Sequence, residues 1–239
     1  MKRIRKKRRV KNYLRIFIVE SLGPIDAIES RSESLGVAAI AKLIGHAVYC
    51  LPCKSLRELT EACAYIGSIN ATHDDNPKTP LCVHLSAHGA DDGLLFGGDD
   101  VNWEMLLNVI QPVLSRDYQG PRILVLSSCE ADQQNLTEKI GRAVKKDKSL
   151  IPPQYIFCAP GKIGWSKAAV GWTVIYHLIP NVNLDKKSEV QRMLEKIKLV
   201  DGPSPHFSPR GRLRGRPRFL EGVTRRNAVD GPLDDVGER

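Results

Sequence analysis

The chain has 239 residues, of which 42% are hydrophobic and 6% aromatic, and this fits one medium-sized α/β domain or one domain with tails. The net charge of +9 lies at the ends, because residues 1–12 carry +8, residues 201–239 carry +2, and residues 13–200 together carry −1. No run approaches the roughly 20 apolar residues of a membrane-spanning helix, and six cysteines are too few for a disulfide scaffold.

The first half of the central region alternates predicted strands and helices. Tyr13–Val19 is a short apolar run rich in β-branched residues, typical of a buried strand, and a Gly-Pro loop follows it. Residues 32–45 have the apolar spacing of a helix, with Ser32 as its cap and Gly45 as its terminator. A second strand over Ala47–Leu51 and a second helix over Ser55–Ile69 complete this half.

The second half continues the alternation. We expect strands and helices in this order: a strand over Leu81–Ser86, a small hairpin or loop over 90–100, a helix over 102–115, a strand over Arg122–Leu126, a helix over 132–145, a strand over 155–158, and helices over 165–178 and 186–199. Asn102 would cap the helix over 102–115, and Pro112 would kink or end it.

This order predicts an α/β fold with a mostly parallel sheet and helices on both faces, a three-layer arrangement. We expect a basic disordered leader (1–12), the domain (13–200), and a disordered tail rich in Arg, Gly and Pro (201–239). The stretch after the leader is short, contains Arg15 and lacks a small-residue cleavage site, so it is not typical of a secretory signal. We therefore expect a soluble cytoplasmic protein with reduced cysteines.

The residues best suited to catalysis follow the ends of two predicted strands. The strand over 81–86 leads to His88 and Gly89, and the strand over 122–126 leads to Cys129, 41 positions after His88. Sites of parallel sheets lie beyond the carboxyl ends of the strands. A thiolate that attacks a carbonyl carbon, with an imidazole that protonates the leaving amine, needs this placement. The alternatives are a turn histidine with a structural partner and a small buried cysteine.

The motifs HLSAHG and LVLSSCE resemble those of caspase-like clan CD cysteine peptidases, and most closely their bacterial CHAT branch. The resemblance spans roughly residues 13–180, although its specific part is these two motifs. It implies that His88 is the catalytic histidine and Cys129 the nucleophile. Gly89 matches the glycine that binds the oxyanion, with the N–H of Cys129 as a second donor at the start of the helix over 132–145.

The resemblance also places Ser127, two residues before the nucleophile, at the pocket for the residue preceding the cut. Ser127 is neither the glutamine of caspases nor the aspartate of metacaspases, so neither acidic nor basic specificity carries over. Arg31, Glu33 and Glu130 are candidate pocket charges, and a surface or capping role is the alternative for each. The caspase pattern of an acidic cleavage linker is not visible.

The resemblance implies a cysteine endopeptidase that acts on a protein substrate without a cofactor, in bacterial regulation or defence. The alternative is a non-catalytic interaction module with the same fold, tethered to DNA or another acidic partner by its basic tails. Within the tail, Arg214, Gly215, Arg216 and Pro217 form the core of an AT-hook, which places arginines in the minor groove of A·T-rich DNA.

Cys50 and Cys53 have the spacing of redox and zinc sites. A zinc site needs a second pair of ligands, and the sequence offers only scattered Cys and His residues. A redox site would lack its usual fold context. We therefore keep a redox or metal role as a third, weaker hypothesis and assign no metal ligands.

Overall fold

The computed structural model of the chain describes residues 11–72, 79–90, 92–129, 131, 135–158, 162–197 and 206–209. Its centre is a six-stranded sheet with the order β2-β1-β3-β7-β8-β9. The strands are β1 (Arg15–Glu20), β2 (Ala47–Pro52), β3 (Leu81–Ser86), β7 (Arg122–Ser127), β8 (Tyr155–Cys158) and β9 (His206–Pro209). The pairs from β2 to β8 are all parallel, and β9 is antiparallel to β8.

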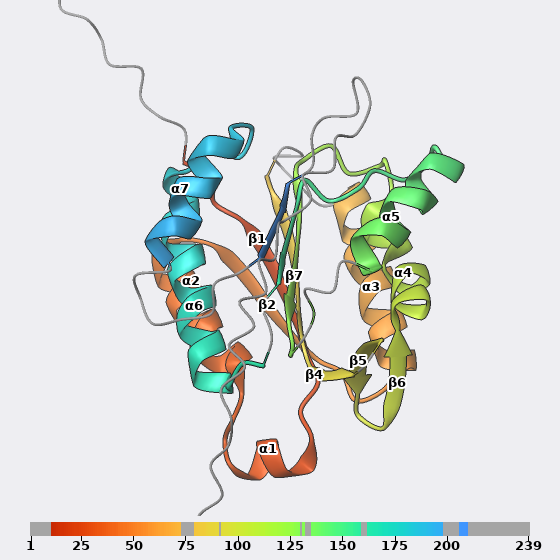
Figure 1. Ribbon diagram of the computed structural model, residues 1–239, viewed down its shortest axis with the longest axis vertical. Helices are drawn as coiled ribbons and strands as arrows, with labels where there is room; N and C mark the ends of the chain where they lie inside the picture. Colours follow the sequence, from red (N-terminus) through yellow and green to blue (C-terminus); the bar gives the residue numbers. More distant parts are fainter. Residues whose placement is uncertain are drawn as a thin grey trace, which may run out of the picture.

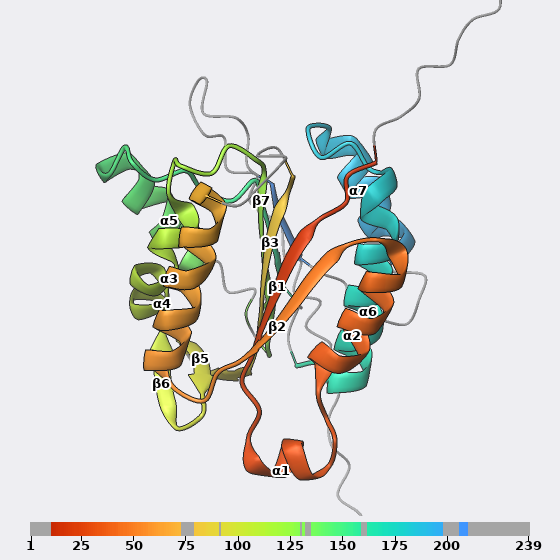
Figure 2. The same ribbon diagram turned by 180° about the vertical axis from the view of Figure 1, so that it is seen from behind.

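Helices cover both faces of this sheet (Figure 1). One layer holds α2 (Glu33–Ile44), α6 (Trp165–Leu178) and α7 (Lys187–Ile197), and the other holds α3 (Leu56–Thr72), α4 (Trp103–Ile110) and α5 (Asn135–Lys146), as the view from behind also shows (Figure 2). The predicted three-layer α/β fold with a mostly parallel sheet is therefore confirmed. Among the described helices none is long and apolar enough to cross a membrane.

Two small elements lie beyond the carboxyl edge of the sheet, at the bottom of Figure 1. One is the short helix α1 (Pro24–Ile28). The other is a three-stranded antiparallel sheet of β4 (His88–Ala90), β5 (Gly93–Phe96) and β6 (Asp99–Asn102). Two 3-10 turns, η1 (Gln111–Leu114) and η2 (Ile179–Asn181), follow α4 and α6.

The sheet separates two hydrophobic cores. Leu81, Val83 and Leu85 of β3 point into the core beneath α3, α4 and α5, whereas Cys82 points into the core beneath α2, α6 and α7. Because successive side chains of a strand alternate between faces, a strand covered on both sides has no solvent-exposed face. All six residues of β3 are buried accordingly, including the polar residues His84 and Ser86.

Most predicted elements match the structure. The strands over 81–86 and 155–158 and the helix over 165–178 have the predicted bounds. Ser32 accepts a hydrogen bond at the start of α2, and Gly45 ends that helix with a left-handed φ of 107°. The helix predicted over 102–115 ends as an α-helix at Ile110 and continues as η1, which contains Pro112.

Two elements differ from the expectations. The loop expected after β1 contains α1, whose five residues are too few to give a periodic pattern. Part of the tail expected to be disordered, His206–Pro209, forms β9 against β8. The Pro, Gly and Arg residues around this segment hide any strand pattern in the sequence. Its extended form depends on hydrogen bonds to the edge of β8, which a sequence pattern within the segment cannot predict.

Glu20, the last residue of β1, attaches the sheet to α2. Its carboxylate accepts hydrogen bonds from the backbone N–H groups of Glu33 (2.7 Å) and Ser34 (3.0 Å), and from the hydroxyl groups of Ser32 and Ser34. A carboxylate at a helix N-terminus satisfies free N–H groups and complements the helix dipole. This contact fixes both ends of the 21–32 segment, which carries α1 over the carboxyl edge.

Candidate active site

His88 and Cys129 follow neighbouring strands. β3 pairs with β7 in a register that sets Ser86 opposite Ser127, and the N–H of Ala87 donates to the carbonyl of Ser127 (3.2 Å). Both chains therefore leave the sheet together at its carboxyl edge. This is the adjacency that the order of elements predicted, although the segment between the two residues holds the small sheet as well as a helix.

The backbones of Gly89 and Cys129 touch. A β-carbon built on Gly89 would lie 2.1 Å from the carbonyl oxygen of Cys129 and 3.2 Å from its nitrogen. No side chain fits at such a distance, so the close approach requires glycine. The chain thus brings the residue after His88 into direct contact with the main chain of the nucleophile candidate.

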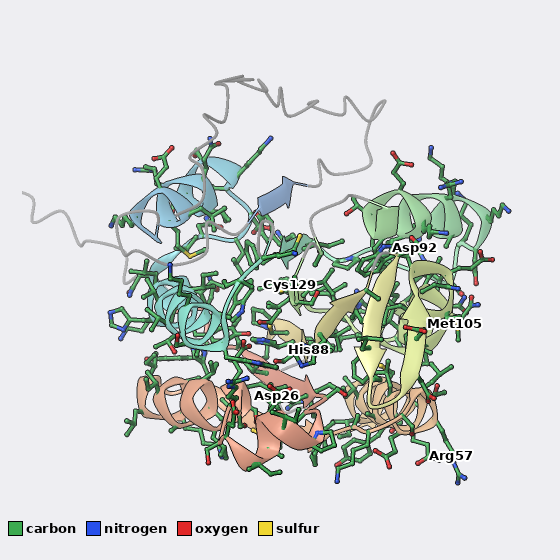
Figure 3. All side chains as sticks on the ribbon, turned by 60° about the horizontal axis from the view of Figure 1, so that its bottom comes forward. Asp26, Arg57, His88, Asp92, Met105 and Cys129 are labelled. Carbon is green, nitrogen blue, oxygen red and sulfur yellow. The ribbon has the colours of Figure 1, made fainter. Side chains whose placement is uncertain are left out.

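The His88 ring is held by two other segments. Its Nε2 lies 2.7 Å from Oδ2 of Asp26, and the ring of Trp165 stands edge-on to it, with centroids 5.6 Å apart and planes at 83°. About half of the His88 side chain, 49%, is exposed. In Figure 3, which brings the carboxyl edge forward, Cys129, His88 and Asp26 are labelled one below another near the centre of the molecule. The imidazole is therefore both oriented and accessible.

Asp26 is the site residue that sequence reasoning missed. It lies in α1, its side chain is 8% exposed, and Arg31 Nη1 lies 3.5 Å from its second oxygen. The hydrogen bond with His88 lowers the pKa of the Asp26 carboxyl, helped by the charges of His88 and Arg31, and outweighs the opposing effect of burial. A signal existed, because an acid in the loop after β1 must lie at the same sheet edge as the residue after the adjacent β3.

Cys129 is partly buried, and its thiol donates to the carbonyl of Ile163 (3.7 Å), just before α6. The helix after it is described from Asn135, and residue 130 and residues 132–134 lie outside the described part of the chain. The sequence-based argument that a helix N-terminus at 132 polarises Cys129 therefore has no structural counterpart among the described residues.

Four of the other cysteines have raised thiol pKa values, which makes them poor nucleophiles at neutral pH. Burial raises the pKa of the thiol to about 11 in Cys53 and to about 12 in Cys63 and Cys82. Cys50 is exposed, and its pKa is raised by partial burial of the sulfur. Cys50, Cys53, Cys63, Cys82 and Cys129 are free thiols.

Ser127 and Glu33 lie beneath the site rather than in a pocket. The Ser127 hydroxyl donates to Oε2 of Glu33 (2.7 Å) and accepts from Nε1 of Trp172 (2.7 Å). The other Glu33 oxygen lies 2.6 Å from Nε2 of His84, whose Nδ1 bonds the hydroxyl of Tyr176 (2.8 Å). We call these five residues the buried network. Glu33 is 1% and Ser127 4% exposed, so in this structure both side chains are buried and hydrogen-bonded to other side chains rather than open to a substrate.

The remaining candidates are placed as follows. The Arg31 side chain is 48% exposed and pairs with Glu29 as well as Asp26, so it stands beside the site. Glu130 and the AT-hook core at 214–217 lie outside the described residues.

Cys50 and Cys53 lie in different surroundings. Cys50 is exposed on β2 and Cys53 is buried in a core. Over the part of the chain that the structure describes, no group of three or more His, Cys, Asp and Glu side chains is placed to hold a metal ion.

Comparison with known proteins gives structural neighbours alone. No family model matches the chain, and no curated protein matches it. The crystal structure of drICE is similar over 84% of this chain and 89% of its own, with 12% identity and a TM-score of 0.49. Caspase-1 from Spodoptera frugiperda is similar over 79% of this chain and 76% of its own, with 15% identity and a TM-score of 0.49. Both neighbours are caspases, the group that the two motifs resemble, and neither bears on the CHAT branch. Likeness at this level does not transfer an activity or a specificity.

Proposed function

We propose that this chain is a cysteine endopeptidase that cleaves a protein substrate, with Cys129 as nucleophile and His88 as general acid and base. One observation carries the proposal: the main chain beside a half-exposed, oriented imidazole is in van der Waals contact with the main chain of a partly exposed cysteine. Such a pair, at the edge where parallel sheets place their sites, has the parts that thiol catalysis needs.

The proposed reaction has two stages. The Cys129 thiolate forms an S–C bond to the scissile carbonyl, and the carbonyl electrons move to the oxygen, which the N–H groups of Gly89 and Cys129 would bind. The C–N bond then breaks, and the amine leaves with a proton from His88. In the second stage His88 takes a proton from water and the hydroxide attacks the thioester carbonyl. The C–S bond then breaks, the carboxylic acid product leaves, and the Cys129 thiolate is restored beside a protonated His88.

The resemblance of the two motifs to the CHAT branch extends this proposal to a role in bacterial regulation or defence, and to the cytoplasm, where free thiols stay reduced. The substrate pocket is left with Arg31 and Glu130 as its candidate charges, because Glu33 and Ser127 are occupied by the buried network.

Selective alkylation tests the proposal. Iodoacetamide should label Cys129 at least about tenfold faster than the other cysteines, since the thiolate is the nucleophile and the buried thiols are protonated. Exposed Cys50 serves as the internal control in the same peptide mass-spectrometric measurement. His88→Ala should slow the labelling of Cys129 and leave the rate at Cys50 unchanged.

Cleavage provides the second measurement. The wild-type chain should cut an unfolded protein such as reduced, alkylated casein, and Cys129→Ala should abolish the cutting. Equal labelling of Cys129 and Cys50, with no effect of His88→Ala and no cleavage, would instead favour the non-catalytic module.

A further inference from the structure

The burial pattern of α1 is the reverse of that expected for a helix held by hydrophobic packing. Ile25 and Ile28 are 66% and 83% exposed, whereas the buried residue of this helix is Asp26. Carboxylates are seldom buried without a specific partner. The described contacts that anchor α1 to the rest of the molecule are therefore those of a charged group, and a reversal of this kind is typical of a functional position.

The surroundings of Asp26 hold its carboxylate in one place. The backbone N–H of Arg31 donates to the carbonyl of Asp26 (2.8 Å), and the Arg31 guanidinium lies 3.5 Å from Oδ1. Ser30 adopts a left-handed φ of 55°, which turns the chain back so that Arg31 can make both contacts. A β-carbon on Gly23 would lie 3.2 Å from Oδ2, so the glycine leaves that oxygen free to meet His88.

The charge of Asp26 fixes the tautomer of His88. With its pKa lowered, the Asp26 carboxyl is ionised at neutral pH and can accept but not donate a hydrogen bond. The proton of the 2.7 Å contact must then sit on Nε2 of His88, which leaves the lone pair of the neutral ring on Nδ1. A ring fixed in this way has one defined nitrogen, Nδ1, that is free to act as the base.

We infer that Asp26 is the positioning residue of a Cys129–His88–Asp26 triad, in which its carboxylate orients the imidazole and selects the tautomer with the proton on Nε2. The inference rests on the proposed peptidase function and deepens it. An acid that orients a catalytic histidine is a recurrent solution on unrelated folds, where it acts by holding the ring and its tautomer rather than by taking a proton. Arg31 supports the triad by holding the other oxygen of Asp26.

The test compares Asp26→Asn and Asp26→Ala with the wild-type chain. Two readouts are needed: the alkylation rate of Cys129 relative to Cys50, and the ¹⁵N and ¹H NMR signals of the His88 ring. The wild-type ring should show a protonated Nε2 and an unprotonated Nδ1. Both variants should give a mixture of tautomers and label Cys129 at least about tenfold more slowly, with Cys50 unaffected.

Two controls separate a positioning effect from misfolding. Asp100→Asn, an exposed carboxyl on β6, should change neither readout. Arg31→Lys keeps the positive charge but loses the fork geometry, and should lower the Cys129 rate less than Asp26→Ala does. Unchanged backbone amide spectra in all variants would show that the fold is retained.

The outcomes distinguish the inference from the function on which it rests. If His88→Ala slows labelling while both Asp26 variants keep the wild-type rate and tautomer, the triad is refuted and the Cys129–His88 peptidase stands. If His88→Ala itself has no effect on Cys129, the proposed function fails, and the triad fails with it.

Discussion

The carbonyl oxygen of Cys129 lies where a side chain on Gly89 would begin, 2.1 Å from an ideal β-carbon. This contact joins the segments that follow two neighbouring strands, and it holds the residue after His88 against the main chain of Cys129. It gives the first of four predictions.

Gly89→Ala should separate the two strand ends. The new methyl group meets backbone atoms, which cannot move aside cheaply, so we expect a stability loss of about 1–3 kcal/mol and at least about tenfold slower labelling of Cys129. Denaturant unfolding and alkylation kinetics measure both effects. The matched control is Gly36→Ala on the exposed side of α2, where nothing lies within 4 Å, and there we expect a gain of about 0.5–1 kcal/mol. Equal behaviour of the two variants would contradict the prediction.

Ser127→Ala should destabilise the fold rather than alter substrate choice. The substitution removes a hydroxyl that both donates to Glu33 and accepts from Trp172, so two buried polar groups lose a partner, at a cost of about 1–3 kcal/mol. Thermal unfolding measures the change. Ser166→Ala, on the exposed start of α6, should stay within about 0.5 kcal/mol of wild type. A variant with wild-type stability and altered cleavage preference would return Ser127 to the substrate pocket.

The stability that Asp26 provides should depend on pH. Because the folded pKa of Asp26 is lowered below its ordinary value of 3.8, its contribution is fully present above that value and is lost as pH falls through the folded pKa. The difference in unfolding free energy between wild type and Asp26→Asn should therefore be largest between about pH 5 and 7, and should shrink toward pH 3. Urea unfolding across this range measures it, and a difference that grows on acidification would have the wrong sign.

Cys63 and Cys82 should report unfolding of the two cores separately. Each is buried, Cys63 on α3 in one core and Cys82 on β3 in the other, and burial raises both thiol pKa values to about 12. Neither should react with a thiol reagent at neutral pH until its core opens. We expect equal protection, because both cores pack on one sheet. Much faster labelling of Cys63 than of Cys82 would show that one helical layer opens independently.

The local sequence determined the elements whose signals are contained within them. β3 and β8 are covered on both faces, and their short, mainly apolar sequences mark them as strands without knowledge of their neighbours. α2 carries its own start and stop in Ser32 and Gly45. The order of these elements was enough to place His88 and Cys129 at one edge of a parallel sheet, because parallel strands joined by helices all end on the same side.

Tertiary structure alone decided which side chains meet at that edge. α1 is held by the contacts of one buried carboxylate rather than by a periodic apolar face. No local pattern within residues 24–28 therefore predicts the helix, and the only signal for Asp26 was its place in the loop after β1. Glu33 and Ser127 have the composition of pocket residues, and 94 positions separate them, yet the packing of α2 against β7 and α6 pairs them and removes them from solvent. Short-range patterns encode backbone conformation, whereas the partner of a polar side chain depends on distant segments that come together only when the sheet has formed.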